Sequence, residues 1–250
     1  MTEKKTIRLN KFIASAGLTS RRGADDLVKQ GKVNINGETA DSPGIQVDPE
    51  IDQVEVNGKL IEYDSQAENV YVLLHKTIET VTTAYDPEGR KTVLDLLPAE
   101  IVKKRVFPVG RLDFYSEGLL MLTTDGELCN RMTHPKWHLP KIYQLTIRGK
   151  LTERQISIME SGMCLEDGEL LAPVKVKTLS EIGDTSKYEL ILHQGINRQI
   201  RRMFSDFKKT ILRLKRVRQG RLELGDLKPG KWRELTAKEI TLLKNDLKMK

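Results

Sequence analysis

Hydrophobic residues recur with two different spacings in the first part of the chain. Between residues 9 and 16 they fall three and four positions apart, the spacing of one helix face, and Gly17 suits the left-handed residue that ends such a helix. Ser20 fits the N-cap of a second short helix. Residues 33–37 and 54–58 alternate instead and end in Asn-Gly, so they predict strands that lead into tight turns.

Beyond residue 69 the pattern mixes strands with helices. Apolar or alternating runs predict strands at residues 70–75, 106–109, 142–147, 174–178 and 188–192, and a further apolar run lies at residues 119–122. Helical spacing predicts helices at 152–161, which opens with a possible capping box, and at 198–207. Hairpin-length connections outnumber strand-helix-strand repeats, so we expect an α+β fold with a largely antiparallel central sheet.

A polar stretch at residues 62–69 has the composition of a linker. It predicts a small domain over residues 6–61 and a larger domain over residues 70–250. The linker offers little to bury, so we expect the position of the small domain relative to the larger one to vary.

The chain of 250 residues carries a formal net charge of +7, which favours a polyanionic partner. The opening residues lack a signal-peptide core, and the longest apolar run is far short of the roughly 18 residues that span a bilayer. We therefore expect a monomeric cytoplasmic protein that does not bind membranes. Its two cysteines, Cys129 and Cys164, are expected to be buried free thiols.

No metal site is predicted. His134 and His138 have the spacing of a helical zinc pair, but Pro135 and Pro140 interrupt any helix there.

Basic residues gather in two stretches. Residues 4–32 hold eight Lys or Arg against two Asp, and residues 198–221 hold ten against Asp206 alone. Arg21 and Arg22 directly follow the expected N-cap Ser20, where cations oppose the helix dipole unless a phosphate binds there. Two solvated arginines without a ligand remain the alternative.

A loop-like stretch carries the strongest chemical signal. Gly110-Arg111-Leu112-Asp113 lies between a predicted strand and the apolar run at residues 119–122, with Gly118 just before that run. Glycines on both sides allow close backbone approach, so Asp113 fits a loop-borne carboxylate at the floor of a cleft. The same residues also fit an ordinary turn with a capping aspartate.

Residues 110–126 resemble the signature of pseudouridine synthases, in which the aspartate after Arg-Leu performs the chemistry. The resemblance makes Asp113 the catalytic residue and Arg111 a substrate-binding residue. Burial alone would raise the pKa of such an aspartate, whereas a neighbouring guanidinium keeps it ionised, so an arginine partner is expected.

Two further segments resemble motifs of that family and follow in its order. In the segment of residues 195–203, Arg201 is the arginine that pairs with the catalytic aspartate. In Lys141-Ile142-Tyr143, Tyr143 is the residue that stacks on uracil and takes part in proton transfer. The other substrate-binding residues that the resemblance implies are Leu192, Arg198 and Arg202.

Residues 6–60 resemble the alpha-L motif, an RNA-binding module shared with a ribosomal protein of the small subunit. The RNA-binding residues expected there are Arg8, Lys11, Arg21, Arg22 and Lys32.

Together with the segments at residues 211–218 and 230–235, these motifs resemble the branch called the RsuA and RluB type. The resemblance implies an enzyme that isomerises a uridine of ribosomal RNA, free or in an assembling subunit, with no cofactor. Details of the motifs favour the large subunit. The alternatives are a small-subunit enzyme, a non-catalytic RNA-binding assembly factor and, more weakly, a glycosidase with two carboxylates.

Overall fold

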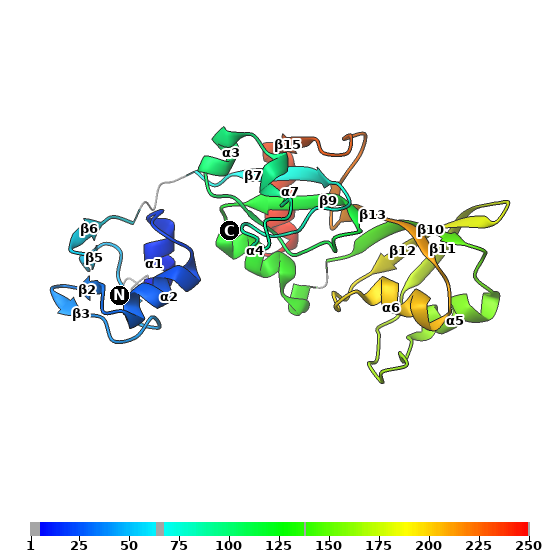
Figure 1. The fold of residues 1–250 in the computed structure, drawn as a ribbon, viewed down its shortest axis with the longest axis horizontal. Coiled ribbons are helices and arrows are strands. Elements are labelled where there is room, and N and C mark those ends of the chain that lie inside the picture. Colours follow the sequence, from blue (N-terminus) through cyan, green and yellow to red (C-terminus); the bar gives the residue numbers. More distant parts are fainter. Residues whose placement is uncertain (1–5, 64–67, 138, 250) are drawn as a thin grey trace. The chain divides into compact units, whose positions relative to one another are not determined.

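A computed structural model describes residues 6–63, 68–137 and 139–249 (Figure 1). The chain forms two compact units, Met1–Glu68 and Asn69–Lys250. Residues 64–67 of the expected linker and His138 lie outside the described residues. No helix of the described part is long and apolar enough to cross a membrane.

The first unit packs two helices against short antiparallel strands. Its helices are α1 (Leu9–Ser15) and α2 (Arg21–Lys29). Its strands are β1 (Ile7–Arg8), β2 (Val33–Ile35), β3 (Glu38–Thr39), β4 (Gln46–Val47), β5 (Val54–Val56) and β6 (Lys59–Ile61). β1 pairs with β4, and the other four strands form a sheet in the order β3-β2-β5-β6.

Local sequence chemistry accounts for the ends of these elements. The Ser20 hydroxyl accepts a hydrogen bond from the Gly23 amide at 3.1 Å, which confirms the predicted N-cap. Asn36-Gly37 and Asn57-Gly58 all have positive φ and turn β2 into β3 and β5 into β6, as their sequences predicted.

The second unit is built on one large sheet. Its strands are β7 (Tyr71–Lys76), β8 (Phe107–Pro108), β9 (Glu117–Thr123), β10 (Lys141–Arg148), β11 (Lys175–Ile182), β12 (Thr185–Leu192), β13 (Ile211–Gln219), β14 (Leu222–Glu223) and β15 (Trp232–Glu234). Its helices are η1 (Leu94–Leu96), α3 (Ala99–Lys103), α4 (Gly126–Thr133), η2 (Pro135–Trp137), α5 (Glu153–Ser161), α6 (Gln199–Asp206) and α7 (Ala237–Asp246). A capping box of Thr152 and Gln155 begins α5, as predicted.

The main path of the sheet runs β11-β12-β10-β13-β9-β7-β15. Among the described strand pairs of this unit only β9 and β13 are parallel, so the expected α+β fold with a largely antiparallel sheet is confirmed. The pair β9 and β13 divides the sheet into an α6 half, with β10–β13, and a β9 half, with β7, β9 and β15 (Figure 1).

Each half has its own core. In the α6 half, α5 and α6 cover one face, where Met159, Met203 and Phe204 pack against strand residues such as Leu145 and Leu190. In the β9 half both faces are covered, because alternate residues of the fully buried β9 enter two different clusters. A strand buried on both sides is a near-continuous apolar run, which accounts for the apolar residues at 119–122.

Several features of the fold differ from the prediction. The basic stretch at residues 198–221 divides into α6, which was predicted, and β13, which was not predicted and is the longest of the described strands. Helices α3, α4 and α7 also had no predicted counterpart. The expectation of two buried thiols is wrong for Cys164, which is exposed, while Cys129 is half-buried.

The two halves meet where Gly118 of β9 lies opposite Arg216 of β13. A Cβ on Gly118 would lie 2.2 Å from the carbonyl oxygen of Arg216, and Gly118 has a φ of +108°. Both the contact and the backbone conformation therefore require glycine. The Arg216 side chain, 2% exposed, extends along this junction and donates from Nε to the Leu119 carbonyl at 2.8 Å.

We predict that Gly118→Ala lowers the free energy of unfolding by at least about 3 kcal/mol, because backbone atoms of β13 cannot move away without breaking the strand pair. Urea unfolding followed by circular dichroism would measure it. Gly89→Ala is the matched control: Gly89 also has positive φ, but its added Cβ meets open space. It should cost about 1 kcal/mol. Equal losses in the two variants would contradict the proposed backbone conflict.

Candidate active site

The loop at residues 109–116 presents Asp113 between β8 and β9. The loop turns tightly, since the Ser116 amide donates to the Asp113 carbonyl at 3.0 Å. From the other side, the Thr82 hydroxyl lies 2.7 Å from the Leu112 carbonyl and 3.3 Å from the Leu112 amide. The Asp113 side chain is about one-third exposed, so the loop is fixed while its carboxylate stays accessible.

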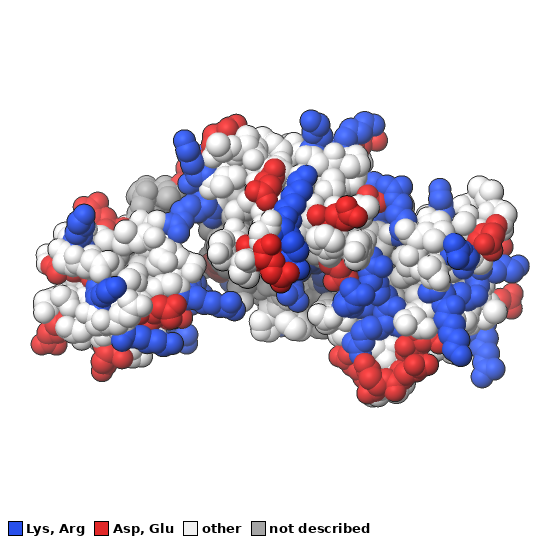
Figure 2. Space-filling view, viewed as in Figure 1, with Lys and Arg blue, Asp and Glu red and all other residues white. Residues whose placement is uncertain are grey.

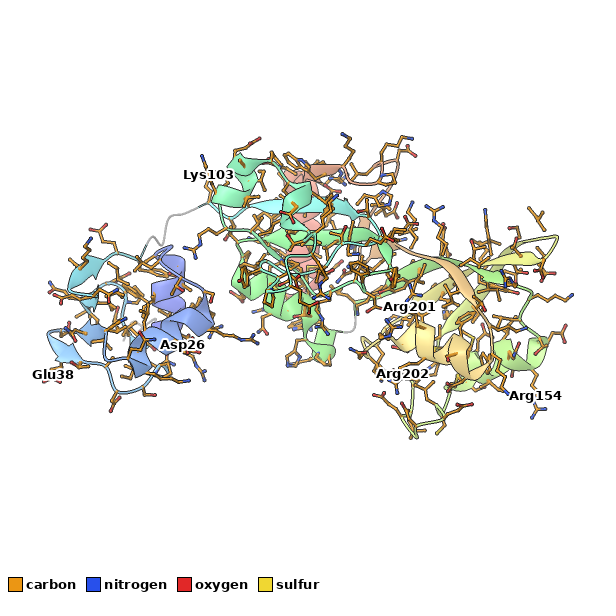
Figure 3. The ribbon with its side chains drawn as sticks, in the orientation of Figure 1. Asp26, Glu38, Lys103, Arg154, Arg201 and Arg202 are labelled. Carbon is orange, nitrogen blue, oxygen red and sulfur yellow. The ribbon has the colours of Figure 1, made fainter. Side chains whose placement is uncertain are left out.

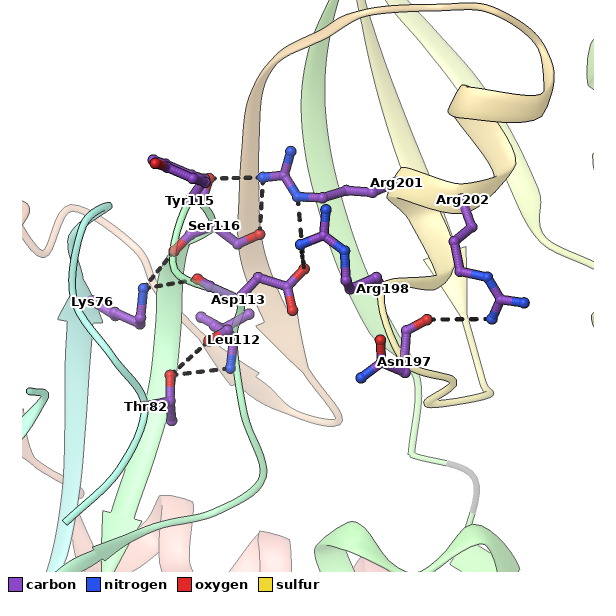
Figure 4. Close-up of polar contacts among 10 residues, drawn as sticks. All are labelled: Lys76, Thr82, Leu112, Asp113, Tyr115, Ser116, Asn197, Arg198, Arg201 and Arg202. Carbon is purple, nitrogen blue, oxygen red and sulfur yellow. Dashed lines mark hydrogen bonds and ion pairs between the residues drawn. The ribbon is translucent and has the colours of Figure 1, made fainter. Parts of the chain in front are cut away.

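A buried lysine holds the same loop from beneath (Figure 4). The ammonium group of Lys76, at the end of β7, donates to the carbonyls of Thr77 at 2.9 Å, Asp113 at 3.0 Å and Ser116 at 2.8 Å. Lys76 is fully buried. Burial lowers the pKa of Lys76 to about 8, and the negative charges of Asp113 and Glu117, which raise this pKa, offset only part of the effect.

Lys76 was not singled out from the sequence. The available signal was a lysine that ends an otherwise apolar strand, in Tyr71–Lys76. Such a lysine is unusual in a core and calls for polar partners, which here are backbone carbonyls of the catalytic loop.

Helix α6 supplies the cationic side of the site (Figure 4). Arg201 Nε lies 3.6 Å from Asp113 Oδ2, and its Nη2 donates to the Tyr115 carbonyl at 2.8 Å and to the Ser116 hydroxyl at 3.3 Å. Burial lowers the pKa of Arg201, and the negative charge of Asp113, which raises this pKa, offsets only part of the effect. The side chain is only 18% exposed, so it is a fixed partner of the carboxylate.

Arg198 approaches the same carboxylate oxygen from a more exposed position. Its Nη1 lies 3.8 Å from Asp113 Oδ2, and its side chain is 53% exposed. The residue caps α6 with φ +49°, a left-handed conformation that is uncommon outside glycine. Asp113 thus faces one anchored guanidinium and one exposed guanidinium.

Tyr143 and Leu192 lie on neighbouring strands of the α6 half. Tyr143 is partly buried and contacts the core clusters of both halves. It stands opposite Arg216, which in turn stands opposite Gly118, so this row of the sheet leads from Tyr143 to the end of the Asp113 loop. Leu192 is buried at the end of β12 in the core that α6 covers.

The structure does not bring Arg202 and Arg111 to the carboxylate. The guanidinium of Arg202 points away from Asp113 (Figure 4). It is bound by the carboxylates of Asp167 and Glu169. Arg111 is exposed on the loop.

In the first unit, all five basic residues predicted to bind RNA are exposed: Arg8, Lys11, Arg21, Arg22 and Lys32. The exposed Arg21 side chain is also held by hydrogen bonds within the unit. Its Nη2 donates to Asn10 Oδ1 at 3.1 Å, and Asn10 in turn donates to Asp25 at 2.8 Å. The first turn of α2 contains no acidic residue. No group of three or more possible metal ligands occurs among the residues that the structure describes.

Comparisons with known proteins match each of the two units to a different family. The family model for RNA pseudouridylate synthases matches residues 70–206, and that for the S4 domain, an RNA-binding module, matches residues 7–50. The chain is 41% identical over 239 residues to a ribosomal large subunit pseudouridine synthase B of Bacillus subtilis, covering 95% of each chain. It is 40% identical to an uncharacterized RNA pseudouridine synthase of Aquifex aeolicus, covering 95% of this chain and 93% of that one. A crystal structure of a pseudouridylate synthase superimposes with a TM-score of 0.67 at 30% identity, covering 95% and 99% of the two chains.

The geometry predicts a specific pH dependence for Lys76→Met. At pH 7 the variant should unfold with a free energy about 1–3 kcal/mol lower, because buried carbonyls lose a donor. The folded state releases the Lys76 proton near pH 8 and the unfolded state only near 10.5, so wild-type stability gains relative to the variant between these values. Urea unfolding at pH 7, 8.5 and 9.5 should show a widening gap. A gap that closes as pH rises would refute a depressed lysine pKa.

Proposed function

The chain belongs to the RNA pseudouridine synthases that carry an S4 domain, and on this premise we propose that it isomerises uridine in large-subunit ribosomal RNA, with Asp113 as the catalytic residue. The observation that carries the assignment of Asp113 is its position: an accessible carboxylate on a clamped loop, facing two arginines of α6. The choice of subunit is supported by relatives named for the large ribosomal subunit, one of them similar over nearly the whole chain.

The reaction breaks the bond between N1 of uracil and C1′ of the ribose, turns the base and joins C5 to C1′. The proton on C5 is then lost, and N1 carries a proton in the product, so atoms and electrons balance without an oxidant. Asp113 acts as nucleophile or as charge stabiliser while the glycosidic bond is open. Both roles require an ionised carboxylate.

Arg201 meets that requirement. A positive charge 3.6 Å from the carboxylate favours its ionised form, and the Tyr115 and Ser116 contacts fix the direction of the guanidinium. The separation is longer than a hydrogen bond, and catalytic contacts in free enzymes commonly tighten only when substrate binds. We assign Arg201 the role of keeping Asp113 charged and oriented.

Tyr143 supplies a flat ring on which an everted uracil can stack, and its hydroxyl is the candidate group for proton transfer at C5. Leu192, which is buried on the neighbouring strand, is the apolar residue proposed to pack beneath the active site. Both roles rest on the match to the family's motifs and on the placement of these residues in the α6 half.

RNA phosphates are the proposed ligands of the exposed arginines. Arg198 lies beside Asp113 and Arg111 lies two residues before it, so both suit the nucleotides that flank the target. Arg202 would contact RNA only after leaving Asp167 and Glu169. In the S4 domain, Arg21 and Arg22 at the N-terminus of α2 suit a phosphate, because backbone amides and guanidinium groups there favour the same anion. Arg8, Lys11 and Lys32 extend this surface.

We predict that Asp113→Asn removes pseudouridine formation by a factor on the order of 10³ or more, since it deletes the charge but keeps the size of the side chain. Cells that lack the gene would be complemented with wild-type or variant protein, and pseudouridines in both ribosomal RNAs mapped by sequencing after chemical marking. The variant should fail to restore a large-subunit mark. Asp226→Asn, at an exposed acid of the same unit, should restore it.

Each result bears on a different part of the proposal. Full restoration by Asp113→Asn would overturn the catalytic assignment. A mark that depends on the protein only in the small subunit would overturn the choice of subunit and leave the enzyme class intact.

Chemistry and RNA affinity should separate between the two units. Arg201→Ala is expected to lower the single-turnover rate at saturating RNA far more than it weakens binding, because its contacts are with Asp113 and its loop. The pair Arg21→Ala and Arg22→Ala should weaken RNA binding and flatten its salt dependence, with the rate at saturating RNA nearly unchanged. Filter binding and quench-flow assays would measure both quantities. Equal loss of rate in the two proteins would contradict this division.

A further inference from the structure

Among the described residues of the second unit, no helix covers one face of the α6 half of the sheet. Along β10, Leu145 and Ile147 point into the core beneath α5 and α6, while Gln144, Thr146 and Arg148 alternate with them and point to the opposite side. The strand register extends this alternation across the four strands. We call the side away from α5 and α6 the outer face.

The outer face is rich in cations. Residues of β11, β12 and β13 that pair in register with the even-numbered residues of β10 also lie on the outer face. The Lys and Arg residues of this face are Arg148, Lys175, Lys177, Lys187, Arg213, Lys215 and Arg218. Lys175, Lys177 and Lys187 are exposed and stand on the two outermost strands, β11 and β12. Figure 2, which views one side of the molecule, shows Lys and Arg interspersed with Asp and Glu over the end of the second unit that holds β10–β13.

Only part of this charge is neutralised within the fold. Arg213 pairs with Glu117, Arg218 pairs with Glu223 at 3.3 Å, and Arg148 pairs with Asp184 at 3.9 Å. Glu189, also on the outer face, accepts a hydrogen bond from Gln144 at 3.2 Å. Among the described residues, no ion pair within 4.0 Å involves the four remaining lysines, which are Lys175, Lys177, Lys187 and Lys215.

The side chains between the lysines indicate the kind of partner. Apart from the half-buried Ile142 and Ile191 and the exposed Ile182 at the end of β11, the outer face presents polar and charged groups, and its described positions include no aromatic residue. Stacking on bases needs aromatic rings, protein interfaces are depleted in lysine, and membrane binding needs apolar side chains to insert. Lysine is a point charge suited to phosphate, and phosphate contacts require no base to be exposed.

We propose that the outer face binds the phosphate backbone of the RNA substrate as a second contact, on the side of the sheet opposite α6. Strands of eight or nine residues and four strands in width give a surface of about 25 by 14 Å, enough for several phosphates. The contact carries no sequence information and would steady a long, folded RNA while its target uridine occupies the Asp113 site. This inference rests on the proposed function for the identity of the RNA.

The test is a triple variant of the exposed lysines on β11 and β12: Lys175→Gln, Lys177→Gln and Lys187→Gln. Its affinity for a full-length large-subunit ribosomal RNA transcript would be measured at several salt concentrations. Loss of three phosphate contacts should weaken binding on the order of tenfold near 0.1 M salt and reduce the slope of log K against log salt by about 2 to 3. Replacing the same lysines by arginine should restore both values.

The matched control removes three other exposed lysines of the same unit: Lys103→Gln, Lys104→Gln and Lys238→Gln. Lys103 and Lys104 lie at the end of α3 in the β9 half, and Lys103 is far from α5 in Figure 3. The control has the same net charge as the test variant and should bind RNA like wild type. Equal weakening in the two triples, or no weakening in the test variant, would overturn the proposal. So would unchanged RNA binding with a lost association to ribosomal proteins, which would identify an acidic protein as the partner.

All binding measurements would use the full-length chain with Asp113→Asn, so that no product forms during the assay. Wild-type protein that binds RNA through the outer face but forms no pseudouridine would refute the proposed function and leave this inference standing. If the wild-type protein forms pseudouridine but the triple lysine variant binds RNA as tightly as the unsubstituted protein, this inference is refuted and the proposed function stands.

Discussion

The geometry of the site depends on a short parallel contact between β9 and β13. Asp113 belongs to the β9 half of the sheet, whereas Arg201 and Arg198 belong to the α6 half, and the two halves share the backbone contact at Gly118 and Arg216. Because a side chain at Gly118 would collide with the opposing backbone, the strands approach closely only with glycine there. The close approach that Gly118 permits therefore sets the distance between Asp113 and the two arginines, Arg198 and Arg201.

Two cationic side chains, the buried Lys76 and the partly buried Arg201, then fix the backbone of the Asp113 loop. Lys76 donates to the carbonyls of Asp113 and Ser116, and Arg201 donates to that of Tyr115, so successive backbone dipoles of the loop are held from opposite sides. The hydrogen bonds of Lys76 go to backbone carbonyls, and those of Arg201 go to the Tyr115 carbonyl and the Ser116 hydroxyl. The carboxylate of Asp113 faces α6 and lies 3.6 Å from Arg201 and 3.8 Å from Arg198 (Figure 4). A rigid backbone with a partly free carboxylate is what a reacting group requires.

Local signals in the sequence predicted local structure well. The N-cap at Ser20, the Asn-Gly turns and the capping box at Thr152 are decided by neighbouring residues, so they could be recognised without tertiary information. β13 could not, because its alternating charges serve an outer face and a junction that exist only in the assembled sheet. The resemblance of the motifs placed Asp113 and Arg201 together, and the structure brings them within 3.6 Å of each other. The carboxylates that bind Arg202 were missed because long-range partners leave no mark on local spacing. Lys76 was missed although it ends an otherwise apolar strand, because its backbone partners lie about 40 residues away in the sequence.

The junction between β9 and β13 also bears on the order in which the protein folds. Its partners, Gly118 and Arg216, are far apart in sequence and pair in parallel, which is the slowest kind of strand contact to form because a long loop must close first. The hairpins of the S4 domain and the antiparallel pair of β11 and β12 involve near neighbours and form early by the same reasoning. During synthesis the RNA-binding module therefore acquires its structure before the catalytic pair exists, and the nascent protein is a ligand for RNA before it is an enzyme.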